Sequence, residues 1–210
     1  MRLLFLYFSG TGNTDYVAHY LAQRLDRVPV EVELRSIEWQ PPEEVTDFDL
    51  LAFGFPVYAA DSPGLVQTYL AQLPPGADRG AFVFCTKGAY AASAVKLNLQ
   101  RLALRGYVPL CGGDVIMPGT DGLSMLSRDS WMARKALQKD YDQLKDGNRL
   151  VGQMNSVLSE LEDGRPIDTL RMPLPPKPKM GPSDRLWAAL YRMTENWSRS
   201  RLHADDQCEG

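Results

Sequence analysis

The sequence has few cysteines and lacks a hydrophobic run long enough to span a membrane. Its three cysteines, Cys85, Cys111 and Cys208, are an odd number and lie far apart, which argues against the disulfide framework of a small secreted protein. The first apolar run, from Leu3 to Phe8, is too short for a transmembrane helix, and no signal-peptide cleavage site follows it. We therefore expect a cytoplasmic protein with no membrane span.

The sequence also has no excess of positively charged residues. The chain has 23 lysines and arginines against 26 aspartates and glutamates, a net charge of −3, so it lacks the basic surface with which proteins bind nucleic acids. With 210 residues, 44% of them hydrophobic, the chain is long enough for one domain of ordinary size and an additional segment. We expect small ligands or proteins as partners, and no nucleic acid.

Apolar segments alternate with amphipathic ones along most of the chain. Five short apolar segments predict buried parallel strands, at Leu3–Phe8, Val28–Leu34, Leu50–Phe55, Ala81–Thr86 and Val108–Met117. Helices are expected between them, at Tyr16–Leu25, Gly64–Leu73 and Ala91–Leu104, with a final helix over Ser130–Leu161 that covers the open face of the sheet. This alternation is typical of a doubly wound α/β sheet.

The loop after the first strand contains small and hydroxylated residues only, in the order Ser9, Gly10, Thr11, Gly12, Asn13 and Thr14. A glycine turn that leads into a helix presents free backbone N–H groups to an anion such as phosphate. A nucleotide-triphosphate loop would need a lysine where Asn13 stands, and a dinucleotide motif would need a glycine where Asp15 stands. What remains is a phosphate site built from N–H groups, hydroxyls and an amide, without a cation.

This S-G-T-G-N-T loop after an apolar strand resembles the phosphate loop of the flavodoxins. The resemblance implies a flavodoxin-like five-stranded parallel sheet of order 2-1-3-4-5, and FMN bound outside the carboxyl ends of the strands. It implies that all six loop residues from Ser9 to Thr14 hold the FMN phosphate. It also implies that two further loops enclose the flavin ring, through Pro56, Val57, Tyr58 and Ala59 after the third strand and through Thr86, Lys87, Gly88, Ala89 and Tyr90 after the fourth.

Three features of the ring loops lead to more detailed expectations. Tyr58 and Tyr90 are expected to stack on the ring, which is worth about 1 kcal/mol beyond the burial of area. Lys87 either lies near the ring, where its charge would raise the potential of the hydroquinone couple, or points to solvent. Flavodoxins often have glycine in the first ring loop, where a peptide flip stabilises the semiquinone. Here Ala59 and Ala60 follow Tyr58, and because alanine resists a positive φ, we expect that flip to be less favourable.

The pattern of the chain changes near its C-terminus. We expect a flavodoxin-like domain over residues 1–163, a proline-rich connector over 164–182, and a helical extension over 183–210. The extension is N-capped by Ser183 and carries an apolar stripe flanked by aromatic residues. The final residues, Cys208-Glu209-Gly210, resemble the start of a bacterial ferredoxin cluster motif, as in chains that fuse a flavodoxin domain to a two-cluster ferredoxin domain. Cys208 would be a ligand of a 4Fe–4S cluster only in a longer form of the chain; otherwise the terminus is polar with an incidental thiol.

The resemblance implies an electron-transfer protein that acts through FMN, with no catalytic side chain. Its redox partner would be a ferredoxin-type protein or a reductase, and its electrons would pass to or from iron–sulfur centres. One alternative is an FMN-dependent oxidoreductase on the same fold, of the quinone reductase or protoporphyrinogen oxidase type. Another is a binding module that has lost the flavin.

Overall fold

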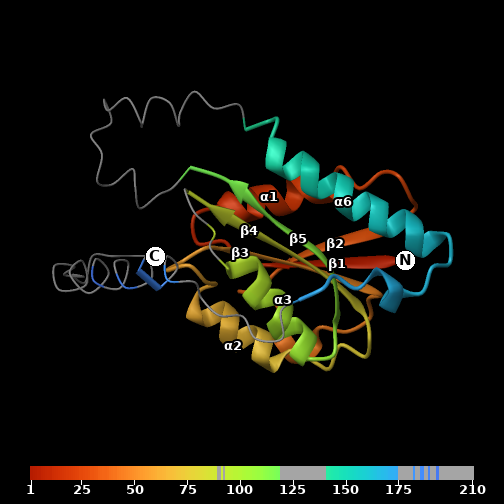
Figure 1. The fold of residues 1–210 in the computed structure, drawn as a ribbon, viewed down its shortest axis with the longest axis horizontal. Helices are drawn as coiled ribbons and strands as arrows, with labels where there is room; N and C mark the ends of the chain where they lie inside the picture. Colours follow the sequence, from red (N-terminus) through yellow and green to blue (C-terminus); the bar gives the residue numbers. More distant parts are fainter. Residues whose placement is uncertain are drawn as a thin grey trace.

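The protein folds around a five-stranded sheet, shown in a computed structural model (Figure 1). The structure describes residues 1–88, 91, 93–118 and 141–174, and also Pro182, Arg185, Leu186, Ala189 and Met193. The strands lie in the order β2-β1-β3-β4-β5 and are parallel throughout, which confirms the expected fold. They span Arg2–Tyr7 (β1), Glu31–Ser36 (β2), Leu50–Pro56 (β3), Gly80–Lys87 (β4) and Val108–Ile116 (β5).

The second strand begins later than predicted. Residues 28–30 precede β2, because Pro29 lacks the N–H group that a strand needs for its ladder. The first ladder bond on this side comes from the N–H of Glu31, which donates to the carbonyl of Met1 at 2.9 Å. β2 is one of the two edge strands, and its side chains are correspondingly less buried than those of β1 and β3.

Within residues 1–174, leaving out the undescribed ones, four helices and two short 3₁₀ turns connect the strands and follow them. They are α1 (Asn13–Ala22), η1 (Pro42–Glu44), α2 (Gly64–Gln72), α3 (Ala94–Leu104), α6 (Lys145–Glu162) and η2 (Ile167–Leu170). α1 begins at Asn13 rather than Tyr16, directly after Gly12, whose φ of 84° ends the loop. α3 begins at Ala94 rather than Ala91.

The last helix of the domain is shorter than the predicted Ser130–Leu161. It begins at Lys145, because Leu144 is extended and its N–H group is held by the hydroxyl of Tyr20 at 3.2 Å. The same hydroxyl donates to Asn148 at 2.6 Å, so a side chain of α1 fixes the start of α6. Residues 130–140 lie outside the described part of the chain.

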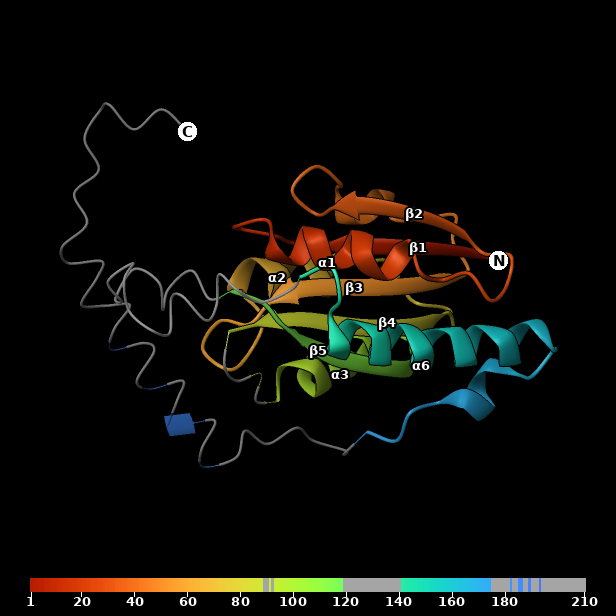
Figure 2. The same ribbon diagram turned by 90° about the horizontal axis from the view of Figure 1, so that it is seen from above.

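The sheet separates two apolar cores. α1 and α6 cover one face, and α2 and α3 cover the other (Figures 1 and 2). Neighbouring residues of a strand point to opposite faces: Phe5 is buried in the first core with α1 and α6, whereas Leu4 and Leu6 are buried in the second with α2 and α3. Both faces of the central strands are thus covered, which explains why the sequence shows continuous apolar runs there.

The chain continues along the domain beyond α6. Ile167 and Leu170, in η2, pack against the first core, and Met172 and Leu174 pack against the second. The N–H of Met172 donates to the carbonyl of Pro109 in β5 at 2.7 Å. The predicted domain limits stay predictions.

Beyond residue 174 the structure describes five residues, four of which lie in the expected helical extension over 183–210. All five are helical, and Pro182, which was expected in the connector, is among them. The expected N-cap, Ser183, lies outside the described part of the chain. The aromatic residues of the predicted stripe lie outside the described part. Among the described residues, no helix combines the length and the apolar character that crossing a membrane requires.

Candidate functional site

The loops that leave the carboxyl ends of four strands are tied to one another by hydrogen bonds. The N–H of Val57, after β3, donates to the carbonyl of Thr86 in β4 at 2.9 Å. The N–H of Met117, after β5, donates to the carbonyl of Lys87 at 2.9 Å. The side-chain amide of Asn13, at the start of α1, donates to the carbonyl of Pro118 at 2.8 Å. These bonds bring the predicted site residues of β1, β3 and β4 to one edge of the sheet.

The first loop forms a cradle of backbone donors. Gly12 has a φ of 84°, which glycine adopts without steric cost, and Asn13 begins α1 directly after it. The N–H of Asp15 is satisfied by the hydroxyl of Ser9 at 3.1 Å. Within the described chain, the N–H groups of residues 11–14 have no protein acceptor. Four unpaired donors at the positive end of a helix dipole suit an anion.

The polar side chains of this loop also make contacts with the protein. Besides the bond from Asn13 to Pro118, the hydroxyls of Thr14 and Thr86 lie 2.9 Å apart, and Thr14 is buried. Thr11, in contrast, is exposed. The direct role of these side chains in holding a phosphate therefore stays a prediction.

Tyr58 connects the second loop to the first. It is 37% exposed, and its hydroxyl lies so close to Gly10 that a Cβ atom at that position would be 3.2 Å away from it. Gly10 thus leaves room for the tyrosine to lie over the phosphate loop. The predicted contacts of Pro56, Val57, Tyr58 and Ala59 with a ring are not tested by this arrangement, but it places an exposed aromatic side chain next to the N–H cradle.

The turn after Tyr58 differs from the expectation that alanine would avoid a positive φ. Ala59 and Ala60 have φ angles of 50° and 71°, a conformation that costs roughly 1–2 kcal/mol for a residue with a Cβ. The turn is closed by two backbone bonds: the N–H of Tyr58 donates to the carbonyl of Asp61 at 2.8 Å, and the N–H of Asp61 donates to the carbonyl of Tyr58 at 3.0 Å. This short two-residue connection requires positive φ angles, whichever residues occupy it.

Asp61 is the centre of a polar network that the sequence did not reveal. Its carboxylate accepts two bonds from Arg101 in α3, at 2.7 and 2.6 Å, one from the N–H of Ser62 at 2.7 Å and one from Asn98 at 3.3 Å. Ser62 also donates to Asn98 at 2.9 Å, and both are buried. The only sequence signal for this network is a polar residue, Asn98, on the apolar face of a helix.

Lys87 is neither free near the site nor directed to solvent. It forms an ion pair with Asp114 of β5, and the two side chains are 18% and 29% exposed. The pair carries no net charge, and the position of Lys87 relative to a flavin ring stays a prediction. Gly88 is exposed next to it.

Several predicted residues lie outside the described part of the chain, namely Ala89, Tyr90 and Cys208. Among the described residues, no cluster of His, Cys, Asp or Glu is arranged for a metal ion. Cys85 and Cys111 are free thiols. Burial raises the pKa of both, that of Cys111 to about 12, so neither is a reactive thiolate near neutral pH.

Comparison with known proteins points to one fold family. Residues 4–105 match the model of the flavodoxin domain family. This match and the strand order show a flavodoxin-like fold. No curated protein matches the sequence.

Three solved structures illustrate the similarity. An archaeal flavodoxin has a TM-score of 0.55 and 14% identity over 77% of this chain and 99% of its own. The flavodoxin of Megasphaera elsdenii, in its two-electron reduced form, has a TM-score of 0.53 and 16% identity over 73% and 98%. The rubredoxin:oxygen oxidoreductase of Desulfovibrio gigas has a TM-score of 0.55 and 15% identity over 77% of this chain but 36% of its own. At these identities the similarity concerns the fold alone.

Proposed function

We propose that this flavodoxin-like domain binds FMN and transfers electrons through it. The observation that carries the proposal is the position of Tyr58 beside the cradle of N–H groups at residues 11–14. The cradle suits the terminal phosphate of FMN, because it supplies several N–H donors at a helix N-terminus. Tyr58 supplies an aromatic surface for the ring at the same sheet edge. When bound, FMN would supply the redox chemistry, and the protein would bind, orient and tune it.

The donor set fits a phosphate monoester attached to a flat ring better than a nucleoside triphosphate. The loop from Ser9 to Thr14 contains no lysine that could reach a second or third phosphate. Thr11 is exposed at its centre, so its hydroxyl is accessible to a ligand. We infer that Gly88, which is exposed after β4, borders the same ring.

We infer that the physiological partner is a protein with an iron–sulfur centre, either a ferredoxin-type protein or a reductase. Support comes from the likeness of the fold to flavodoxins and from the Cys208-Glu209-Gly210 sequence at the end of the chain. We also infer a cytoplasmic location, from the scarcity of cysteine. Reduction of the FMN-loaded chain by a reduced ferredoxin would support this partner class, and rapid turnover of a dissolved quinone would favour an oxidoreductase instead.

The proposal is tested by titrating FMN with the purified chain and following the quenching of flavin fluorescence. Thr11→Glu should abolish binding, because a carboxylate beside the N–H cradle repels the phosphate, whereas the neutral isostere Thr11→Gln should bind more tightly than Thr11→Glu. Tyr58→Ala should weaken binding, and Tyr16→Ala should not. Tyr16 is a matched control, since it is 39% exposed on α1. FMN that stays free and fluorescent at micromolar protein would refute the proposal.

A further inference from the structure

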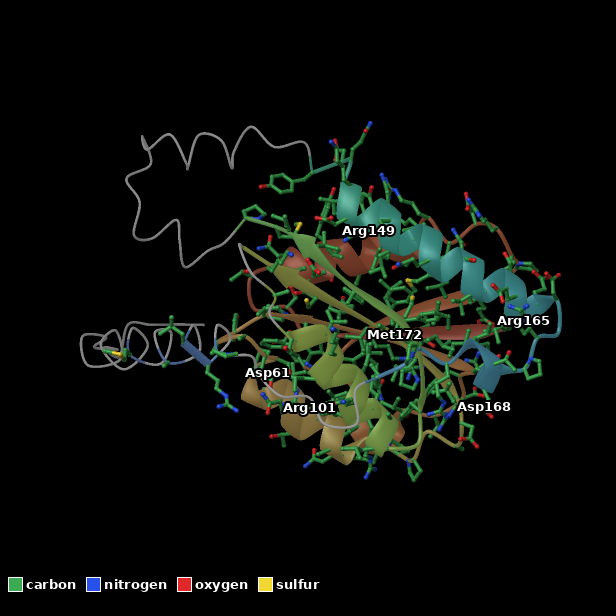
Figure 3. All side chains as sticks on the ribbon, in the orientation of Figure 1. Asp61, Arg101, Arg149, Arg165, Asp168 and Met172 are labelled. Atoms are coloured by element: carbon green, nitrogen blue, oxygen red, sulfur yellow. The ribbon has the colours of Figure 1, made fainter. Side chains whose placement is uncertain are left out.

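A bidentate ion pair connects the turn after β3 to helix α3. Arg101 donates from two nitrogens to the two carboxylate oxygens of Asp61, at 2.7 and 2.6 Å, and Figure 3 shows the two residues next to each other on the side of the sheet that carries α2 and α3. Their side chains are only 28% and 20% exposed. Bidentate pairs fix the relative orientation of their partners as well as their distance.

Further hydrogen bonds hold the arginine in place. The side-chain oxygen of Asn98, one turn earlier in α3, accepts from Arg101 at 3.1 Å and from Ser62 at 2.9 Å. Its side-chain nitrogen donates to the carbonyl of Ala94 at 2.8 Å. Because Asn98 is fully buried, it has one well-defined orientation, and α3 therefore presents Arg101 to Asp61 as part of a rigid unit.

Asp61 is also the residue that closes the strained turn. Its backbone exchanges two hydrogen bonds with that of Tyr58, and between them lie Ala59 and Ala60 with positive φ angles. Non-glycine residues keep such a conformation only where the surrounding structure over-determines it. The contacts of Asp61 with Arg101 and Asn98 attach the end of the turn to a helix.

We propose that Arg101 is a positioning residue of the flavin site. Through Asp61 it holds the turn from Tyr58 to Asp61, and with it the Tyr58 side chain above Gly10, in the conformation that receives the flavin ring. The inference rests on the proposed binding of FMN. It assigns to α3, whose residues 94–104 lie outside the three predicted loops, a role in setting flavin affinity.

The test compares the Arg101→Met variant with the unchanged 210-residue chain. Methionine keeps much of the apolar stem of arginine but cannot pair with Asp61. We expect FMN to bind about tenfold more weakly, equivalent to ~1.4 kcal/mol, and the visible spectrum of the bound flavin to change. Arg101→Lys should also weaken binding, because lysine cannot form the bidentate pair. The control is Arg149→Met, which removes an exposed ion pair with Asp146 on α6, on the other side of the sheet (Figure 3), and should leave the affinity unchanged.

A rescue experiment separates positioning from general support of the fold. Glycine accepts a positive φ without strain, so a turn with both Ala59→Gly and Ala60→Gly no longer needs the ion pair to stay closed. Adding Arg101→Met to that double variant should change the FMN dissociation constant by less than about twofold, far less than in the alanine background. Circular dichroism melting of each variant establishes that it is folded.

The outcomes are distinct. Unchanged FMN affinity in Arg101→Met, or an equal loss of affinity in the alanine and glycine backgrounds, would overturn the positioning role. If the unchanged chain fails to bind FMN, the proposed function is refuted. The effect of the ion pair on the turn is then measured by hydrogen exchange without ligand. Faster exchange at the amides of Tyr58 and Asp61 in Arg101→Met, with β3 unaffected, would support its hold on the turn, and unchanged exchange would overturn it.

Discussion

The hydroxyl groups of Thr14 and Thr86 lie 2.9 Å apart and share a buried hydrogen bond. Thr14, the last residue of the predicted phosphate loop, belongs to the first turn of α1. Thr86, the first residue of the predicted second ring loop, lies near the end of β4. Their exposed fractions are only 1% and 4%. The bond therefore sets the spacing between two loops that are far apart in the sequence.

Thr14→Val should lower the free energy of unfolding by about 1–3 kcal/mol, because it leaves the Thr86 hydroxyl buried without a partner. The double variant Thr14→Val with Thr86→Val should be less destabilised than the sum of the single variants, since it buries no unpaired hydroxyl. Urea unfolding measures both. Thr46→Val, at an exposed position, is the control and should change little. Strict additivity of the two single effects would contradict the proposed coupling.

Ala59→Gly should raise the free energy of unfolding by about 1 kcal/mol, because it removes the strain of a positive φ. Ala60→Gly should gain less, since the Ala60 methyl group is buried and its removal costs apolar contacts. The matched control is Ala103→Gly within α3, which should be destabilising by about 1 kcal/mol. Thermal and urea unfolding provide the measurement, and a destabilising Ala59→Gly would show that the turn is not strained.

With the ion pair of Lys87 and Asp114 intact, the potential of a bound flavin should lie between the values expected with the carboxylate alone and with the lysine alone. Lys87→Met leaves the Asp114 carboxylate alone and should lower the potential of the hydroquinone couple, whereas Asp114→Asn leaves a cation and should raise it. Shifts of some tens of millivolts are expected, where about 59 mV is a tenfold change for one electron. Spectroelectrochemical titration with Arg165→Met as a remote control measures them. Equal potentials in all variants would mean that the pair lies too far from the ring to act.

Stability at alkaline pH should depend on Tyr7. Burial, followed by a hydrogen bond to Asp15, raises the pKa of Tyr7 from 10 to about 12. Since the folded state favours the protonated form, this contribution is complete below pH 10 and is lost as the pH rises toward 12. The free energy of unfolding of Tyr7→Phe should therefore fall less steeply above pH 10 than that of the unchanged protein. At pH 11 the difference between the two losses should be roughly 1 kcal/mol. Urea unfolding at each pH measures this difference. Parallel plots of unfolding free energy against pH for the two proteins, from pH 8 to pH 11, would disprove the role of Tyr7.

The sequence was sufficient for those parts of the fold that depend on local pattern. Continuous apolar runs predict strands with two buried faces, and the glycine loop after the first strand predicts the strand order, because both signals lie within short segments. The limits of elements were less predictable. The late start of β2 depends on Pro29, which the apolar run from Val28 concealed, and the late start of α6 depends on Tyr20 in a different helix.

The details of the site were less predictable, because they depend on contacts between distant segments. Lys87 and Asp114 are brought together by the pairing of β4 with β5, which includes a register shift between Ala81 and Phe82. The positive φ angles of Ala59 and Ala60 contradict the local preference of alanine. They follow from a turn whose last residue is bound to α3. Local propensity is commonly overridden at positions where a functional site stores strain.

The segment after α6 determines where this chain can be truncated. Ile167 and Leu170 contribute to the core under α1 and α6, and Met172 and Leu174 contribute to the core under α2 and α3. Residues 167–174, which we call the strap, therefore pass around the β5 edge of the sheet. A fragment that lacked this strap would leave apolar surface uncovered on both faces and would expose the edge of β5 near Pro109 to pairing with other molecules. The shortest fragment expected to stay dispersed at high concentration therefore extends through Leu174.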